Sequence, residues 1–319
     1  VLTLSLFLLF FKYRFKPIKE AWKKFKPLFF FLFILLISLL INWSKYNSFE
    51  NTVASLYFFR LLLYFFYFFY LKYSSQTVKK GIFLIAILTI ILTLTQYFLY
   101  PDLRNLLYQG WDPHLYRTFG VFFDTSIAAA IFGILFLTIN QPVIKIIYLI
   151  LIALSFSRAI YLGLSLTLIY IFIQKKQFKK IFLFLLFFIV LIFIIPKPAG
   201  EGVNLKRLYS ITSRGQDYLQ GINLWKNKPV LGYGYNRIRY VKNSDSFHSG
   251  ASFSSSFLTI LVSSGVLGLL GFLGVLGRLG KINKTSQYLI IFLSIISLFD
   301  NIILHPFILF LLFTSLSDK

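Results

Sequence analysis

The chain alternates between long apolar runs and short polar segments, and this alternation predicts its secondary structure. Runs at 28–41, 56–71, 82–99 and 181–195 approach or reach the length at which a helix crosses a hydrocarbon layer about 30 Å thick. They lack the period-two alternation of strands, which argues against an outer-membrane barrel. The pattern therefore predicts an all-α fold, a polytopic transmembrane helical bundle.

The apolar runs predict about eleven spans. The first run, 1–11, opens in the middle of a hydrophobic stretch and suggests a truncated N-terminus. Further helices are expected at 27–43, 52–71, 81–99, 119–139, 144–157, 159–174, 181–195, 251–276, 287–299 and 301–316. One long loop, 196–250, separates the eighth span from the ninth. We divide the chain into N-terminal helices (1–114), a core that contains the loop (115–275) and C-terminal helices (276–319).

Composition supports a membrane protein, since hydrophobic residues make up 58% of the chain and charged residues 13%. The absence of cysteine excludes disulfides, thiolate metal sites and a cysteine nucleophile. The net charge of +23 could indicate nucleic-acid binding. In a membrane protein, however, such charge more often reflects topology signals and attraction to anionic lipids, so membrane lipids and no nucleic acid are the expected partners.

Basic clusters fall between alternate apolar runs, at 12–26, 72–80, 175–180 and 278–284. If these clusters are cytoplasmic, the loop 196–250 lies outside the cytoplasmic membrane. The loop is itself basic, and two interpretations stay open. Long loops translocate regardless of charge, so its lysines and arginines could simply contact lipid headgroups. Alternatively, the loop binds an anionic substrate at the outer surface.

Part of the loop carries a helical stripe, formed at spacings of three and four by Arg207, Ile211, Arg214, Tyr218, Ile222 and Trp225. Arginines on an apolar stripe face protein or membrane and need anionic partners. The segment ends in a turn at Pro229, Gly232 and Gly234. Gly232-Tyr-Gly234 is only a weak phosphate-loop signal, because no Gly-Lys-Ser/Thr follows and no strand precedes it.

Two residues are candidates for chemistry from position alone. His248, at the end of the loop, is either an ordinary helix-entry residue or a general base, for which its ordinary pKa near 6.5 is suitable. Arg158 interrupts an apolar stretch and either forms an internal salt bridge, with Asp124 as a candidate partner, or binds an anion; Arg60 is a second such charge. No carboxylates or histidines show metal-ligand spacing, so metal-free chemistry without a cofactor is favoured.

Four stretches occur in a characteristic order. They are Arg117 to Asp124 with Ala128, Ser157-Arg158-Ala159, Arg214 with Trp225, Pro229 and Gly232-Tyr-Gly234, and His248 followed by 258–267 with Gly265 and Gly268. Over residues 115–275 this ordered set resembles the O-antigen ligase and O-antigen polymerase superfamily of membrane glycosyltransferases. Asp124-Thr125 departs from the Asn-Pro of many relatives, and Ser249 follows the histidine in place of Asn.

The resemblance implies an enzyme that transfers a glycan from an undecaprenyl-diphosphate carrier to an acceptor hydroxyl on a glycan or lipid. The reaction would occur without metal, at the outer face of the inner membrane. Arg158 and Arg214 would hold the diphosphate, Arg117 would add a further cation, and His248 would be the base or an acceptor-binding residue. The helical stripe adds Arg207 as a further candidate for diphosphate binding.

Two other classes were considered. A polysaccharide or small-anion transporter is the main alternative, but the unusual charges lie towards one face and no internal repeat is evident, unlike in many transporters. A structural scaffold would leave Arg158 without a role beyond salt bridging. Ligase and polymerase need the same donor site, so the sequence leaves that choice open, along with the sugar and the acceptor.

Overall fold

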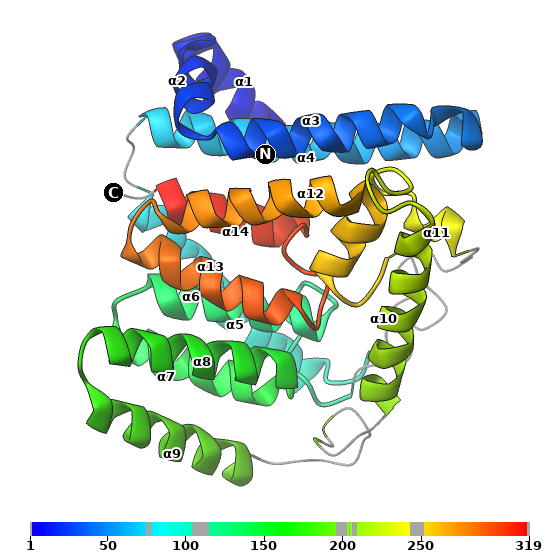
Figure 1. Ribbon diagram of the computed structural model, residues 1–319. Coiled ribbons are helices and arrows are strands. Elements are labelled where there is room, and N and C mark those ends of the chain that lie inside the picture. The colour runs from blue at the N-terminus through cyan, green and yellow to red at the C-terminus, as the bar shows by residue number, and fades with distance from the viewer. Residues whose placement is uncertain are drawn as a thin grey trace.

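The computed structural model describes residues 2–74, 78–103, 115–195, 203, 205, 209–242 and 252–317. In these residues every regular element longer than an isolated bridge is a helix, as predicted (Figure 1). They are α1 (Leu2–Tyr13), α2 (Lys16–Lys24), α3 (Lys26–Ile41), the 3-10 helix η1 (Trp43–Lys45), α4 (Ser48–Ser74), α5 (Lys79–Leu99), α6 (Thr125–Thr138), α7 (Pro142–Leu154), α8 (Arg158–Gln174), α9 (Phe178–Ile194), α10 (Tyr209–Asn227), α11 (Ile238–Val241), α12 (Ser256–Gly280), α13 (Lys284–Ser297) and α14 (Pro306–Ser317).

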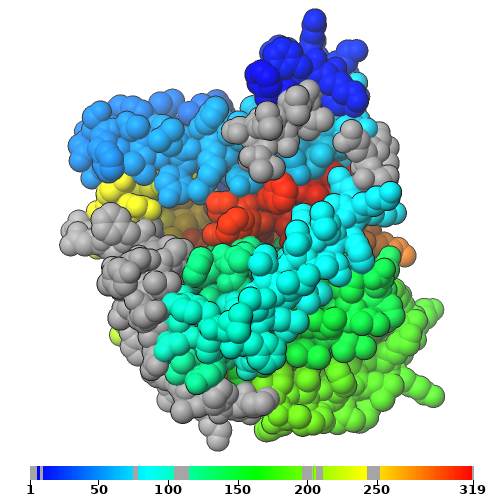
Figure 2. All heavy atoms as spheres, turned by 180° about the vertical axis from the view of Figure 1, so that it is seen from behind, coloured from blue at the N-terminus to red at the C-terminus, as the bar shows by residue number. Residues whose placement is uncertain are grey.

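Most helices lie roughly parallel or antiparallel and stack in rows (Figure 1). α3 packs on α12, α12 on α13, α13 on α8, and α8 on α9. Figure 2 shows α5, in cyan, running obliquely over the back of this stack. α10 departs from this arrangement, because it crosses the ends of the other helices at a steep angle and packs on α12 (Figure 1). It therefore lies across one end of the bundle rather than within it.

Several helices have the length and composition of membrane spans. α4, α5 and α12 qualify individually, and α2 with α3 would make a fourth span although the two are bent by 98°. α6, α7, α8 and α14 are shorter apolar helices. The structure thus supports a helical membrane protein, whereas the total of about eleven spans stays a prediction.

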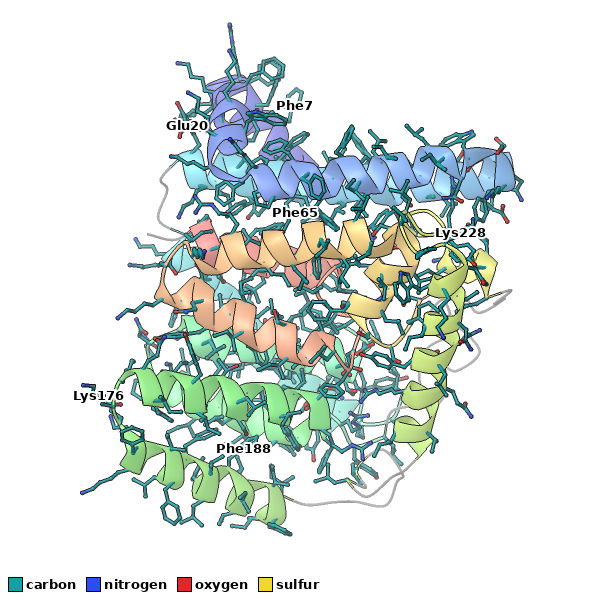
Figure 3. All side chains as sticks on the ribbon, in the orientation of Figure 1. Phe7, Glu20, Phe65, Lys176, Phe188 and Lys228 are labelled. Carbon is teal, nitrogen blue, oxygen red and sulfur yellow. The ribbon has the colours of Figure 1, made fainter. Side chains whose placement is uncertain are left out.

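The two ends of the helix stack carry segments that the topology prediction assigns to opposite sides of the membrane. Lys176, between α8 and α9, lies at one end, and Lys228, after α10, lies at the other (Figure 3). The first belongs to a cluster expected inside, the second to the loop expected outside. The alternating arrangement is therefore compatible with the structure, while the identity of the cytoplasmic end remains a prediction.

Glycines allow close packing at the centre of the bundle. A Cβ atom on Gly133 of α6 would lie 2.2 Å from the ring of Phe292 in α13, and one on Gly163 of α8 would lie 2.4 Å from Ile296. The Phe292 side chain is fully buried as a result. Small residues at these contacts permit three helices to pack tightly where lipid supplies no hydrophobic driving force.

α12 is interrupted at Gly265, whose φ of 67° and ψ of −170° are not helical. The turn that follows α10 fits into this break. The Val266 amide donates to the Pro229 carbonyl at 2.8 Å, and the Gly234 amide donates to the Ser263 carbonyl at 2.8 Å. We call residues 229–234 and 262–267 together the clip.

The clip explains the glycines that the sequence singled out. A Cβ atom on Gly232 would lie 2.4 Å from the Val262 carbonyl oxygen, and one on Gly265 would lie 2.1 Å from the Val230 carbonyl oxygen. Both positions also require positive φ. Gly232-Tyr-Gly234 is therefore a backbone packing element and not a phosphate loop.

The N-terminal helices hold the clip in place. Ser38 of α3 donates its hydroxyl to the Ser263 carbonyl at 2.8 Å, and the Asn42 amide donates to the Gly232 carbonyl at 3.1 Å. The fully buried Arg237 donates from Nη1 to the Leu39 carbonyl at 3.2 Å, and its guanidinium lies 4.4 Å from the Tyr46 ring centroid. Arg237, one of the basic loop residues, thus has a structural role.

Candidate functional site

A cavity of about 610 Å³ opens at the α10 end of the bundle. This volume falls within the range of small-molecule sites. Its polar and charged lining comes from segments that are distant in sequence: Tyr57, Arg60, Arg117, Asp124, Thr125, Ser126, Ser157, Arg158, Arg214, Asp217, Tyr235, Asn236, Arg239, Ser252, Ser254, Thr259, Ser263, Asp300, Asn301 and His305. Three of the arginines expected to bind substrate, Arg117, Arg158 and Arg214, thus share one cavity.

Arg117 and Arg158 are positioned by backbone carbonyls. The nearly buried Arg117 donates from Nε to the Ser155 carbonyl at 2.7 Å. Arg158 is the first residue of α8 and donates from Nη1 to the Leu205 carbonyl at 3.1 Å. Carbonyl contacts of this kind fix the direction in which a guanidinium group points.

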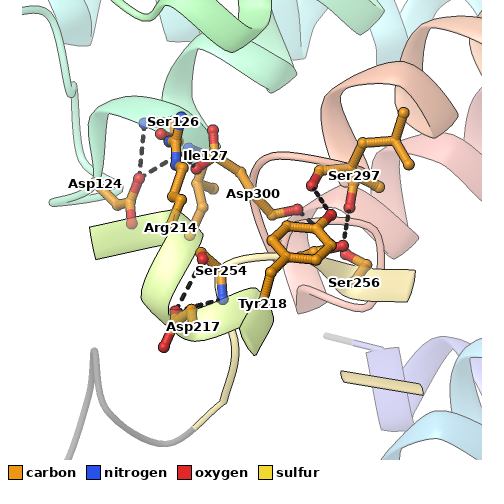
Figure 4. Close-up of polar contacts among 12 residues, drawn as sticks. Asp124, Ser126, Ile127, Arg214, Asp217, Tyr218, Ser254, Ser256, Ser297 and Asp300 are labelled. Carbon is orange, nitrogen blue, oxygen red and sulfur yellow. Dashed lines mark hydrogen bonds and ion pairs between the residues drawn. The ribbon is translucent and has the colours of Figure 1, made fainter. Parts of the chain in front are cut away.

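Asp124 does not lie one turn inside a helix as the sequence suggested. α6 begins at Thr125, later than the expected start at 119, and Asp124 is its N-cap. The Asp124 carboxylate accepts from the amides of Ser126 at 2.7 Å and Ile127 at 2.9 Å (Figure 4). Capping of free amides by a carboxylate is a common cause of such a helix start.

Arg214 of α10 forms an ion pair with Asp300, in the segment between α13 and α14. The Arg214 Nη2 to Asp300 Oδ1 distance is 2.6 Å, and the side chains are 29% and 13% exposed (Figure 4). Tyr218 also connects α10 to this part of the chain, because its hydroxyl donates to the Leu298 carbonyl. These contacts fix the first half of α10 against the segment between α13 and α14.

A second polar cluster surrounds Asp217, on the same helix. Its carboxylate accepts from the Ser254 amide at 3.0 Å and the Ser254 hydroxyl at 2.8 Å, and it pairs with Lys242 Nζ at 3.2 Å (Figure 4). Asp217 therefore joins α10 to the segment that precedes α12. Both clusters line the cavity, so α10 forms one of its walls.

The predicted stripe on α10 faces the protein only in part. Arg214 and Tyr218 do face the protein, but Ile211 and Ile222 are 54% and 37% exposed. Asp217, which does not belong to the predicted stripe, also makes protein contacts. The ion pairs of Arg214 and Asp217 fix the rotation of the helix. A stripe identified from apolar spacing does not include Asp217, so it cannot predict these contacts.

Burial raises the pKa of Asp300 to about 6, although the adjacent Arg214 opposes this shift; the charge of Asp124 adds to it. Protonation of Asp300 is therefore favoured in the folded protein below about pH 6. As the pH falls through this value, the cavity loses one negative charge and Arg214 loses its ionised partner. Anions should bind more tightly in the acid range.

We expect a dialkyl diphosphate, whose own charge is constant over this range, to bind about ten-fold more tightly near pH 5 than near pH 7.5, as the loss of one nearby charge implies. Binding to purified protein at constant ionic strength would measure this. Asp300→Asn should bind tightly at both pH values. An equal pH dependence in Asp300→Asn would instead assign the titration to another group, such as His305.

Two expected site residues, Arg207 and His248, lie outside the described residues. The structure instead adds Asp217, Asn236, Arg239, Asp300 and His305 to the lining of the cavity. Asp300 could have been noticed from sequence, because it is an isolated carboxylate between two apolar runs in a chain with only 10 acidic residues. Within the described ranges, no three metal-ligating side chains lie close enough to hold a metal ion.

Comparison with known proteins gives one family. Residues 143–273 match the family model described as O-antigen ligase. This range contains Arg158, Arg214 and His248, whereas Arg117 and Asp300 lie outside it. No curated protein matches the chain. The match agrees with the resemblance identified over residues 115–275.

Proposed function

Since the chain belongs to the O-antigen ligase superfamily through residues 143–273, we propose that it transfers a glycan from an undecaprenyl-diphosphate carrier to an acceptor hydroxyl. The observation that supports this most strongly is the convergence of Arg117, Arg158 and Arg214 on one cavity. The acceptor would be a glycan or a lipid, and the reaction would occur at the outer face of the inner membrane.

Arginine suits the proposed chemistry. Breaking the bond between sugar and diphosphate develops negative charge on the leaving group, and fixed guanidinium groups stabilise this charge. Arginine stays protonated and binds phosphate oxygens in a bidentate manner. The hydrogen bonds of Arg117 and Arg158 to carbonyls, and the ion pair of Arg214 with Asp300, hold the three groups in place before the donor arrives.

The place of α10 supports a reaction at the membrane surface. The helix crosses the ends of the bundle (Figure 1), and its residues Arg214 and Asp217 line the cavity. A lipid carrier has its diphosphate at headgroup depth, so an arginine cavity at the ends of the spans is at the required level. By contrast, the charges of a transporter site are expected near the midplane.

His248 is our proposed base for the acceptor hydroxyl. It must be neutral to accept a proton, so the transfer rate should rise with pH through its pKa. His305, which lines the cavity, is the alternative base if His248 proves dispensable.

The proposed function is tested by supplying the purified protein with a glycan on undecaprenyl diphosphate and an excess of acceptor glycan. Free carrier diphosphate and a lengthened glycan should appear together. His248→Ala should lower the rate by a factor of about 10² to 10⁴ and retain donor binding. A transporter reconstituted in vesicles would move the glycan intact and release no carrier, which would contradict the proposal.

A further inference from the structure

Two arginines in the cavity have no anionic partner among the residues that the structure describes. The three carboxylates of the lining are already engaged, since Asp300 pairs with Arg214, Asp217 pairs with Lys242, and Asp124 caps α6. Among the residues that the structure describes, Arg60 and Arg239 pair with no carboxylate. Their charges are therefore available to a ligand.

Arg239 and its neighbour Asn236 have unsatisfied donors. Arg239 Nε and Asn236 Nδ2 are buried and have no hydrogen-bond acceptor in the described part of the chain. Both residues line the cavity. Burying a donor without an acceptor is costly, and a site of this kind normally receives its acceptor from a ligand or from water.

Arg60 is an unusual residue for its position, because it lies in the apolar helix α4. Its guanidinium lies 4.4 Å from the Tyr57 ring centroid. Burial raises the pKa of Tyr235 to about 12, and the charge of the nearby Arg60 opposes this shift. Charged residues inside apolar helices are costly unless they pair or line a polar cavity. Arg60 lines the cavity between two tyrosines rather than beside an acidic residue.

Arg60 and Arg239 are contributed by a different side of the cavity from the proposed diphosphate ligands. α4 lies in the upper rows of the stack and α11 beside the adjoining end of α10, whereas Arg158 begins α8 in the lower rows (Figure 1). A diphosphate held by Arg117, Arg158 and Arg214 would leave the α4 side of the cavity for another part of the substrate.

We propose that Arg60, Asn236 and Arg239 form a second anion subsite, which binds a carboxylate or phosphate group on a sugar of the glycan. The natural glycan would then be acidic; this identification of the ligand as a glycan rests on the proposed function. Guanidinium groups bind such oxyanions through paired hydrogen bonds, and the Asn236 amide donates to a further oxygen. The rings of Tyr57 and Tyr235 offer apolar surface to the face of a sugar ring.

The test measures ligand binding to the full-length protein in detergent at constant ionic strength. The probes are methyl glucuronide, glucose 6-phosphate, neutral methyl glucoside, inorganic phosphate and a dialkyl diphosphate. At least one of the two acidic sugars should bind ten-fold or more tightly than methyl glucoside and than inorganic phosphate. Arg60→Gln and Arg239→Gln should each weaken that binding at least ten-fold and leave diphosphate binding within two-fold.

Lys226→Gln is the matched control, since it removes a positive charge from an exposed position on α10 that does not line the cavity. It should leave all probes unaffected. Equal binding of acidic and neutral sugars, no effect of either arginine substitution, or inorganic phosphate bound as tightly as the acidic sugars would each overturn the proposal. Asn236→Leu removes no charge and should also weaken acidic-sugar binding. It therefore tests the subsite even if an arginine variant fails to fold.

Measuring diphosphate binding distinguishes a failure of the second subsite from a failure of the proposed function. Loss of acidic-sugar preference with intact diphosphate binding and glycan transfer would reject the second subsite alone. Failure of diphosphate binding and of transfer, with acidic-sugar binding retained, would reject the proposed glycan transfer and leave an acidic-sugar site.

Discussion

Replacing Arg158 or Arg214 with Ala should lower the rate of glycan transfer by at least about 10²-fold, the effect typical of removing a group that stabilises developing charge. Arg158→Lys and Arg214→Lys should recover little activity, because an ammonium group cannot reproduce the paired hydrogen bonds of a guanidinium. The measurement is the initial transfer rate per amount of folded, membrane-inserted protein.

Two comparisons make this prediction specific. Lys226→Ala removes a cation from the exposed face of α10 and should keep normal activity. Asp300→Asn weakens the ion pair of Arg214 but leaves the guanidinium available to substrate. If Asp300→Asn lost as much activity as Arg214→Ala, Arg214 would act mainly as a structural partner of Asp300. Near-normal transfer by Arg158→Lys would exclude the bidentate role of Arg158.

Gly265→Ala should destabilise the protein severely. The new Cβ would lie 2.1 Å from the Val230 carbonyl oxygen, in a backbone conformation with φ of 67°. Strain of this kind costs about 1 to 3 kcal/mol, and separating the two halves of the clip adds to it. We expect a lower midpoint of thermal unfolding in detergent and a lower yield of folded protein.

Gly277→Ala is a matched control in the same helix. No heavy atom lies within 4 Å of a Cβ built there, and no positive φ is required. This substitution should be neutral or slightly stabilising, because alanine favours helix more than glycine does. Equal stability of the two variants would show that the clip is dispensable.

The sequence pattern was sufficient to predict the bounds of helices whose apolar runs end clearly. The expected helices 81–99 and 159–174 correspond closely to α5 and α8. The expected helix 251–276 corresponds to α12, but its interruption at Gly265 was missed. A single glycine in an apolar run carries no signal of a break, since the break is stabilised by a turn that lies elsewhere in the chain.

α2 was missed because its charges were interpreted as a topology signal. Lys16 to Lys24 is rich in lysine and was assigned to a cytoplasmic linker, yet it forms a helix bent by 98° from α3. Its apolar positions pack on α3 and α4. Amphipathic order within a basic cluster is easily overlooked when charge is used only to orient spans.

The candidate site was predictable in part. Arg117, Arg158 and Arg214 line one cavity, while their roles in diphosphate binding stay predictions. The partner of Arg214 was not predictable, because Asp300 lies 86 residues away and no local pattern connects the two. The same limit applies to Arg60 and Arg239, which are brought together only by the packing of α4 beside the loop after α10.

The hydrogen bonds between α3 and the clip can form only late in synthesis, because their partners are far apart in the sequence. Ser38 reaches carbonyls that are 193 and 225 residues further along the chain. At a translation rate of about 5 to 20 residues per second, these carbonyls are synthesised roughly 10 to 45 seconds after Ser38. Asp300 emerges later still. The arginine cavity therefore cannot be completed until Asp300 has been synthesised.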